Sequence, residues 1–303
     1  MAGPAKLFDR TLLDARRRRA LAGRQEGADF LLAAAVDDLV DRLGAVKRSF
    51  ALALDLATPL PLLAERLVAN AAIGTVLRLD RLAEAIGDRQ AGIAGDPELL
   101  PFRAESLDLV ASALALQWIE DLPGTLAQIR HALKPDGLFI ANLIGGETLR
   151  ELRESFAFAE AELTGGASPR VAPFAELRDL GALLQRAGFA LPVIDQDRLT
   201  VRYGSALELM RDLRMMGAGN ALIERSRKPL RRNVLMRAAE VYAERFADAD
   251  GRIRATFDIV SLSGWAPHES QQQPLRPGSA KTRLADALGV TELPAGEKTG
   301  RQK

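Results

Sequence analysis

Three aspartates lie where their side chains could bind one ligand together. Asp55 and Asp80 each end an apolar run typical of a buried strand, and Asp96 follows a third, weaker run. A nucleoside cofactor that lies across neighbouring strand ends needs a carboxylate for its ribose diol and a polar partner for its adenine. Asp80 comes 25 residues after Asp55, which suits the diol ligand, and Asp96 is placed to accept from the adenine amino group. One such aspartate is more often a turn or cap residue, but three at successive strand ends predict a cofactor site.

The segments that would position these aspartates alternate between strand-like and helix-like patterns. Strands are predicted over 49–55, 75–80, 91–94, 106–112, 137–142, 193–203 and 253–263. Helices are predicted over 7–43, 61–68, 82–86, 125–133, 148–163 and 174–187. Because such alternation produces βαβ units, we expect an α/β fold with a Rossmann-like, doubly wound and mostly parallel sheet. Sheets of this type bind ligands at the carboxyl ends of their strands.

The patterns also divide the chain into parts. We expect an N-terminal helical segment over 1–45 and an α/β core over 46–204 and 252–266. A helical insertion over 205–251 would separate the last two strands and is well placed to cover the cofactor face. The remainder, 267–303, is a tail rich in Pro, Gln and Gly.

Composition excludes several classes of function. The 303 residues hold 41 basic and 40 acidic side chains, and this balance argues against a nucleic-acid partner. With no cysteine and two histidines, disulfides, thiolate nucleophiles and multi-histidine metal sites are excluded, so no metal is expected. No apolar run approaches the roughly 18 to 20 residues of a membrane span, and no secretory signal is evident. We therefore expect a cytoplasmic protein without a transmembrane segment.

One local run of charge stands out against this balance. Arg16 to Arg19 are four consecutive arginines within the predicted N-terminal helix. The simpler interpretation is a solvated helix face, and the alternative is a contact with an acidic partner or a membrane surface.

Four motifs, in order and spacing, resemble the class I S-adenosylmethionine-dependent methyltransferases after their third strand. They are Asp96-Pro97-Glu98-Leu99-Leu100-Pro101-Phe102, Ser106-Leu107-Asp108-Leu109-Val110, Leu116-Gln117-Trp118-Ile119 and Leu133-Lys134-Pro135-Asp136-Gly137-Leu138. The resemblance implies a seven-stranded sheet and S-adenosylmethionine as cofactor. The cofactor-binding residues that follow from it and from the strand ends are Asp55, Ala57, Asp80, Asp96, Pro97 and Gln117.

Other motifs narrow the resemblance. Residues 115–118 and 149–153 resemble the biotin-pathway malonyl-carrier-protein methyltransferases and their relative, the mitochondrial complex I assembly factor with a methyltransferase fold. Residues 7–10, 213–220 and 264–272 resemble the assembly-factor group and its bacterial counterparts, so the likeness spans nearly the whole chain. For that group it implies cofactor binding and modification of a complex I subunit, by arginine hydroxylation rather than methylation. The expected partner is a protein or carrier-bound substrate.

The segment after the first strand departs from the methyltransferase pattern. The family has Asp-x-Gly-x-Gly-x-Gly, whereas this chain has Ala57, Pro59 and Pro61 at the glycine positions. Glycine lets the backbone approach the cofactor and adopt positive φ, while each proline fixes φ near −65° and removes an N–H. Either the loop follows another path or its affinity for the cofactor is weak or lost.

No residue announces itself as a nucleophile, which is compatible with methyl transfer by proximity and orientation. The catalytic candidates are Gln117 and Trp118, which follow the fourth strand, and His268 near Trp265. Trp118 is equally well a core aromatic, and His268 is more simply a loop histidine. Three functions stay open: an S-adenosylmethionine-dependent methyltransferase, an arginine hydroxylase of a complex I subunit, and a non-catalytic assembly or binding module. The sequence leaves the oligomeric state open.

Overall fold

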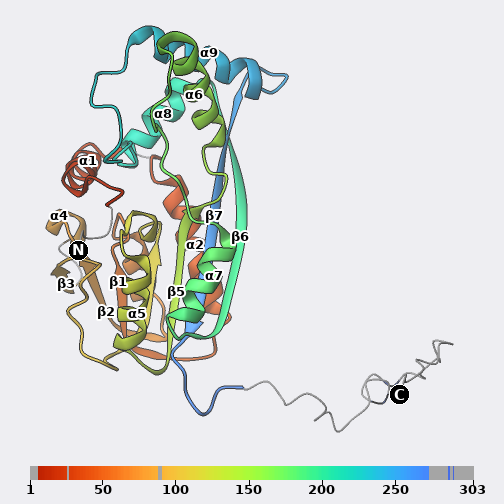
Figure 1. Ribbon diagram of the computed structural model, residues 1–303. Coiled ribbons are helices and arrows are strands. Elements are labelled where there is room, and N and C mark those ends of the chain that lie inside the picture. The colour runs from red at the N-terminus through yellow and green to blue at the C-terminus, as the bar shows by residue number, and fades with distance from the viewer. Residues whose placement is uncertain (1–5, 26, 88–90, 273–285, 287–288, 290–303) are drawn as a thin grey trace, which may run out of the picture. The chain divides into compact units, whose positions relative to one another are not determined.

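A computed structural model describes residues 6–25, 27–87, 91–272, 286 and 289. The chain divides into two units, Met1–His268 and Glu269–Lys303. The first unit contains all the named helices and strands (Figure 1). Most of the predicted tail lies outside the described residues.

Within the described part of the chain, seven strands form one sheet in the order β3-β2-β1-β4-β5-β7-β6. β7 pairs antiparallel with both β5 and β6, and the other pairings are parallel. The strands are β1 (Phe50–Leu56), β2 (Ile73–Asp80), β3 (Ala91–Ala94), β4 (Leu107–Ala113), β5 (Leu133–Gly145), β6 (Ala190–Tyr203) and β7 (Ile253–Trp265). The predicted Rossmann-like, mostly parallel, seven-stranded sheet is confirmed.

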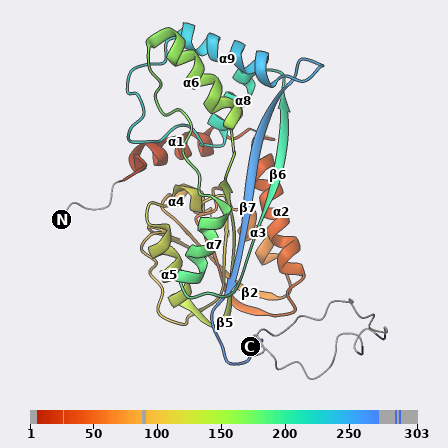
Figure 2. The ribbon, with the colours of Figure 1, turned by 45° about the vertical axis from the view of Figure 1, so that its right-hand side comes forward.

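Helices cover both faces of this sheet, as Figure 2 shows. α2 and α3 pack on one face, and α5 and α7 pack on the other. The helices are α1 (Arg10–Ala22), α2 (Phe30–Gly44), α3 (Leu62–Val68), α4 (Ala83–Ile86), α5 (Leu122–Ala132), α6 (Arg150–Thr164), α7 (Leu177–Arg186), α8 (Ala206–Met215) and α9 (Arg232–Phe246). A short 3₁₀ turn, Leu116–Trp118, follows β4. The two layers of helix bury the central strands β1 and β4, which read as apolar runs because both of their faces are covered.

The single helix predicted over 7–43 is wrong in one respect, because the structure has two helices there. α1 ends at Ala22, and Gly27 then adopts a φ of +82° before α2 begins at Phe30. Glycine takes this left-handed conformation without the steric cost that other residues meet. α2 packs its apolar stripe on the core, whereas α1 buries only Leu13 among its own residues. α2 is therefore a core helix, whereas α1 contacts its neighbours mainly through charged side chains.

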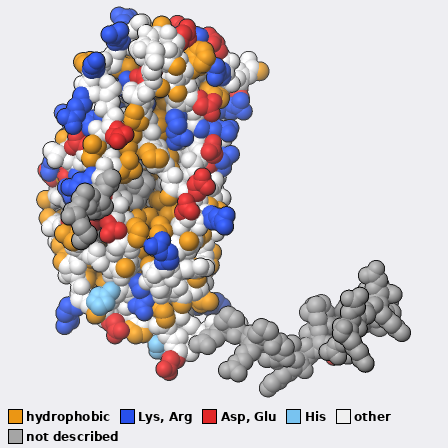
Figure 3. Space-filling model, in the orientation of Figure 1, with side chains coloured by type: hydrophobic (Ala, Val, Ile, Leu, Met, Phe, Trp, Pro, Cys, Tyr) orange, Lys and Arg blue, Asp and Glu red, His pale blue; other side chains and the backbone are white. Residues whose placement is uncertain are grey.

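The predicted helical insertion between the last two strands is confirmed as α8 and α9. These helices and α6 gather beyond the carboxyl end of β5, where β6 and β7 extend to meet them (Figures 1 and 2). α1 lies between this helical layer and the sheet, in contact with α4 and α8. Basic and acidic side chains are interspersed over the face shown in Figure 3. No helix among the described residues is long and apolar enough to cross a membrane.

Candidate functional site

The three aspartates singled out in the sequence lie at one edge of the sheet. Asp55 is at the end of β1, Asp80 ends β2, and Asp96 follows β3 by two residues. The strands are neighbours in the order β3-β2-β1, with Asp80 paired in register with Ala94. Parallel strands bring their carboxyl ends to the same edge, so the structure gathers these carboxylates as the sequence predicted.

The loop after β1 keeps part of the geometry that glycine would give. Ala57 adopts a φ of +58°, the left-handed conformation that disfavours a side chain. Thr58 is fully buried, and its hydroxyl accepts a hydrogen bond from the Ala113 N–H at 3.1 Å. Pro61 has a φ of −69° at the N-cap of α3, a value that the proline ring fixes. The loop thus follows a left-handed course at its first glycine position, and at its third it offers no N–H.

A fully buried arginine lies under this loop. Arg78, on β2 and in register with Asp55, donates to the carbonyl oxygen of Thr58 and places its Nε 3.4 Å from Asp55 Oδ2. The Asp55 carboxylate forms no close hydrogen bond within the described structure, although the hydroxyl and N–H of Thr58 act to lower its pKa. Burial raises the pKa of Asp55 to about 6, although the Arg78 charge opposes the shift, and burial lowers the pKa of Arg78. A charged residue inside the apolar run 75–80 was the one sequence signal for this pair.

Asp80, the predicted diol ligand, is fully buried and already has partners. Arg17 of α1 donates to both of its oxygens, from Nη1 to Oδ1 at 3.2 Å and from Nη2 to Oδ2 at 2.7 Å. The Leu82 N–H donates to Oδ1 at 2.8 Å. Two-pronged contacts of this type are among the stronger side-chain interactions. A ribose bound to Asp80 would therefore compete with Arg17.

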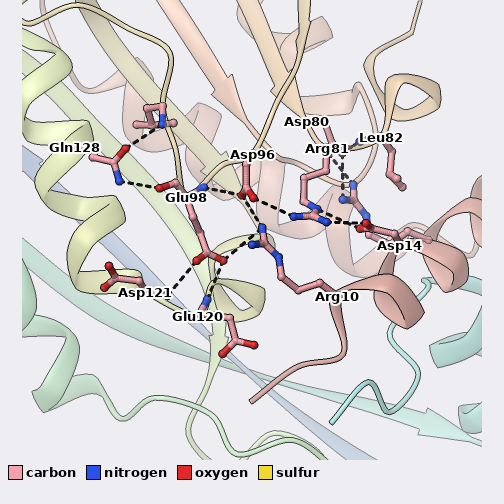
Figure 4. Close-up of polar contacts among 12 residues, drawn as sticks. Arg10, Asp14, Asp80, Arg81, Leu82, Asp96, Glu98, Glu120, Asp121 and Gln128 are labelled. Carbon is pink, nitrogen blue, oxygen red and sulfur yellow. Dashed lines mark hydrogen bonds and ion pairs between the residues drawn. The ribbon is translucent and has the colours of Figure 1, made fainter. Parts of the chain in front are cut away.

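Asp96, the predicted adenine partner, is also held by arginines (Figure 4). Arg10 of α1 donates to Oδ1 at 2.5 Å and Arg81 donates to Oδ2 at 3.1 Å, both side chains pointing at the carboxylate. Arg81 also pairs with Asp14 of α1 at 2.9 Å. Burial raises the pKa of Asp96, but the hydrogen bonds from Arg10 and the Glu98 N–H outweigh it and leave that pKa lowered. The carboxylate is therefore held ionised between two cations.

The run Arg16–Arg19 is divided between its two interpretations, because Arg18 and Arg19 are exposed, as on a solvated helix face, whereas Arg16 and Arg17 are partly buried. Arg17 has 15% of its side chain exposed and binds Asp80, and Arg18 pairs with Glu84 at 3.2 Å. Arg16 lines a cavity on the insertion side of α1. Arg17 and Arg18 contact acidic groups of this chain, and the Arg17 contact ties α1 to the end of β2.

The other predicted residues near the aspartates, Pro97, Gln117 and Trp118, differ in their surroundings. Pro97 is buried beside Asp96, and Gln117 donates from Nε2 to the Leu114 carbonyl at 2.7 Å while its Oε1 is buried without a hydrogen-bond partner among the described residues. Trp118 packs edge-on against Phe8, with ring centroids 5.2 Å apart. Gln117 and Trp118 thus lie after β4, on the side of the predicted site.

His268 lies apart from this site. It follows β7, whose last residue, Trp265, pairs with Leu138 near the start of β5. Since β7 runs antiparallel, that position is at the edge of the sheet opposite to the carboxyl ends of the parallel strands. The structure therefore does not bring His268 together with the aspartates. Across the described residues, no group of three or more His, Cys, Asp or Glu side chains is arranged to hold a metal ion.

Sequence reasoning missed a contact between two distant motifs. The N-terminal segment 7–9 pairs with 221–223, through Asp9 N–H to Ala221 O at 2.7 Å and Ile223 N–H to Leu7 O at 2.9 Å. The carboxylate of Glu120 accepts from the N–H groups of residues 7 and 8 at 2.8 and 2.6 Å. The segment before α1 is therefore tied both to the insertion and to the loop after β4.

This arrangement has relatives among known proteins. The family described as "Methyltransferase domain" matches residues 60–141. The mitochondrial arginine-hydroxylase NDUFAF5 of Danio rerio is 39% identical over 271 residues, covering 88% of this chain and 84% of that protein. The chain belongs to the NDUFAF5 family. The similarity reaches beyond the methyltransferase domain into the N-terminal helices and the insertion, the parts that cover the strand ends.

The NDUFAF5 family has wider relatives. A malonyl-[acyl-carrier protein] O-methyltransferase of Xylella fastidiosa is 39% identical over 175 residues, 58% of this chain and 57% of that protein. The solved structure of a Bacillus halodurans protein matches with a TM-score of 0.54 at 15% identity, covering 78% of this chain and all of the other. At that identity the likeness shows the fold alone. Both comparisons agree with a class I methyltransferase fold.

Proposed function

We propose that this chain is an S-adenosylmethionine-binding enzyme that modifies a protein or carrier-bound substrate in the assembly of respiratory complex I. The observation that carries the proposal is the side-by-side placement of Asp80 and Asp96 at the ends of β2 and β3. Membership of the NDUFAF5 family supports a protein substrate, because the relatives that cover most of this chain are named as arginine hydroxylases.

The residues present fit this cofactor in part. Asp80 would hold the ribose diol and Asp96 the adenine amino group, and Ala57 retains the left-handed backbone of the loop. The buried Oε1 of Gln117, which has no hydrogen-bond partner in the described structure, is an acceptor left for a ligand. Bound there, the cofactor supplies an activated methyl group.

The chain's own residues set a condition on this binding. Arg17 holds Asp80 and Arg10 holds Asp96, and both arginines belong to α1. For the cofactor to reach these carboxylates, α1 has to release them, by a shift of the helix or of the two side chains. After the cofactor has bound, α1 would cover the site and exclude water, which strengthens the electrostatic contacts within the site. Gln117 and Trp118, after β4, would orient the acceptor.

Calorimetric titration with S-adenosylmethionine and S-adenosylhomocysteine tests the proposal. We expect binding by the wild type, loss of binding in Asp80→Asn and weaker binding in Asp96→Asn. Asp197→Asn is the control, because that carboxylate is 69% exposed and lies on β6. Mass spectrometry of a complex I subunit incubated with the protein and S-adenosylmethionine, with and without O₂ and a reductant, then separates an added methyl group from an added hydroxyl group.

A second candidate is a non-catalytic assembly or binding module. It is favoured by Pro59 and Pro61 in the loop and by the arginines that already occupy both carboxylates. No heat and no thermal shift at millimolar cofactor, with the wild-type fold intact, would favour this module and contradict the enzyme.

A further inference from the structure

A cavity of about 440 Å³ lies on the insertion side of α1, away from Asp80 and Asp96. Its walls come from three stretches that are distant in sequence: α1, the segment after α6 and the segment before α9. Most of the lining side chains are hydrogen-bond donors, namely Arg16, Arg170, Asn220, Arg225, Ser226 and Arg227. The lining holds four arginines and one carboxylate, that of Asp9, so the cavity carries excess positive charge.

The acidic groups nearby are already used. Asp9 accepts from the Leu12 N–H at 3.1 Å and from Arg225 at 2.9 Å. Arg170 is paired with Glu160, which also accepts from the Ser168 N–H at 2.7 Å. These contacts hold Arg170 and Arg225 in position, and Asp9 acts on Arg16 and Arg227 through its charge without a direct ion pair.

Arg16 and Arg227 are the arginines left over. Neither forms an ion pair with any described residue, and Nη1 of Arg16 is buried with no hydrogen-bond partner there. Burial lowers the pKa of Arg16, and the charges of Arg225 and Arg19 add to that effect. A buried donor atom without a partner costs stability, and in folded proteins an ordered water or a bound ligand usually completes it.

The backbone is shaped around this side chain. Gly219 lies against Arg16, and a Cβ added at Gly219 would come within 2.9 Å of Arg16 Nη1. Asn220 then ties the two walls together, donating to the Pro169 carbonyl at 2.7 Å and accepting from the Leu222 N–H at 3.1 Å. Gly219 and the Asn220 contacts therefore form the wall against which Nη1 of Arg16 packs.

We propose that this cavity, which we call the arginine pocket (Arg16, Arg170, Arg225 and Arg227), binds an oxyanion, either a phosphate or a carboxylate, carried on a larger ligand. Arginine forks match the geometry of both groups. The volume exceeds that of a bare ion and falls within the usual range for small-molecule sites, so the anion is one end of its ligand. The site is separate from the proposed cofactor site, since Arg16 faces the arginine pocket and Arg17 faces Asp80.

The test uses inorganic phosphate and acetate as probes, each added to the full chain at constant ionic strength against sodium chloride. We expect one or both to raise the melting temperature, and calorimetry or ³¹P line broadening to give a dissociation constant. Arg16→Gln and Arg227→Gln should each weaken that binding about tenfold, the loss of one charge-assisted hydrogen bond. Whichever probe shows the larger pocket-dependent effect identifies the anion as phosphate or carboxylate.

Two controls keep the result interpretable. Arg103→Gln removes an exposed arginine that forms no ion pair with the described residues and lies before β4, so it should bind like the wild type. Arg227 is exposed, so Arg227→Gln should leave the fold intact. Arg16→Gln should keep or raise the melting temperature of the free protein, because it removes an unpartnered buried charge. Equal effects in the wild type and both pocket variants, or no effect beyond that of chloride, would overturn the proposal.

Discussion

Arg17 of α1 donates hydrogen bonds to both carboxylate oxygens of Asp80, at 3.2 and 2.7 Å, although the two residues are 63 positions apart in the sequence. The carboxylate is fully buried and the arginine nearly so. A buried carboxylate needs such a partner, because desolvation without compensation costs several kcal/mol. The contact therefore stabilises α1 over the strand ends and, in the same geometry, occupies the group that we expect to bind the cofactor ribose.

Arg17→Gln should separate these two effects. If the ribose competes with Arg17 for Asp80, removing the guanidinium should strengthen binding of S-adenosylhomocysteine by about tenfold. The same change leaves the buried Asp80 carboxylate with the Leu82 N–H but without its bound cation, so unfolding in urea should show a loss of about 3 kcal/mol. Arg18→Gln is the matched control, because its partner Glu84 is exposed and a solvated ion pair contributes little to the free energy of unfolding. Weaker binding by Arg17→Gln would mean that Arg17 belongs to the ligand site instead.

The buried pair of Asp55 and Arg78 should be costly to break on one side. Arg78→Met leaves Asp55 fully buried without its cation, and we expect a loss of about 3 to 5 kcal/mol in the free energy of unfolding. The double variant Asp55→Leu/Arg78→Met should recover most of that loss, because two apolar groups then replace two charges. Urea denaturation of the two single variants and the double variant gives the coupling. Additive losses would contradict an interacting pair.

The raised pKa of Asp55 predicts a dependence of stability on pH. The pKa of Asp55 is about 6 in the folded protein, against an ordinary value of 3.8, so the folded state binds the proton more tightly than the unfolded state does. Its contribution is fully present below about pH 4 and is lost as pH rises through 6, a fall of about 3 kcal/mol. Asp96 and Asp258, whose pKa values are lowered, change below that window. Denaturation from pH 4 to 7 should show the fall in the wild type and its absence in Asp55→Asn.

The sheet could be predicted because its central strands are buried on both faces. That burial makes β1, β2 and β4 read as apolar runs, and Asp55 and Asp80 near the ends of β1 and β2 followed from the same pattern. The break between α1 and α2 was missed although Gly23 and Gly27 lie in it, because a glycine within a helical pattern does not by itself end a helix. Local sequence patterns therefore predict the helices and strands, whereas the break between α1 and α2 depends on the backbone conformation of one residue, Gly27.

The partners of the site could not be read from the sequence. Arg17 and Asp80 are far apart in the chain, and a run of four arginines does not show which one turns inward. The pairing of Asp9 with Ala221 joins segments that only the folded insertion brings together. Arg78 left a local sign, a cation within an apolar strand, but not its partner. These pairings are contacts between residues distant in the sequence, and such contacts produce no periodic pattern from which they could be predicted.

Ala57 provides the last test, because it stands where the methyltransferase pattern has its first glycine. Its φ of +58° is unfavourable for alanine and free for glycine, so Ala57→Gly should leave the free energy of unfolding unchanged or raise it by up to about 1 kcal/mol. Ala161→Gly, on the exposed side of α6, should instead cost about 1 kcal/mol, the usual helix penalty. Equal losses in the two variants would contradict a left-handed backbone at Ala57. The difference between the two variants, measured by urea denaturation, therefore reports the loop conformation that a cofactor would meet.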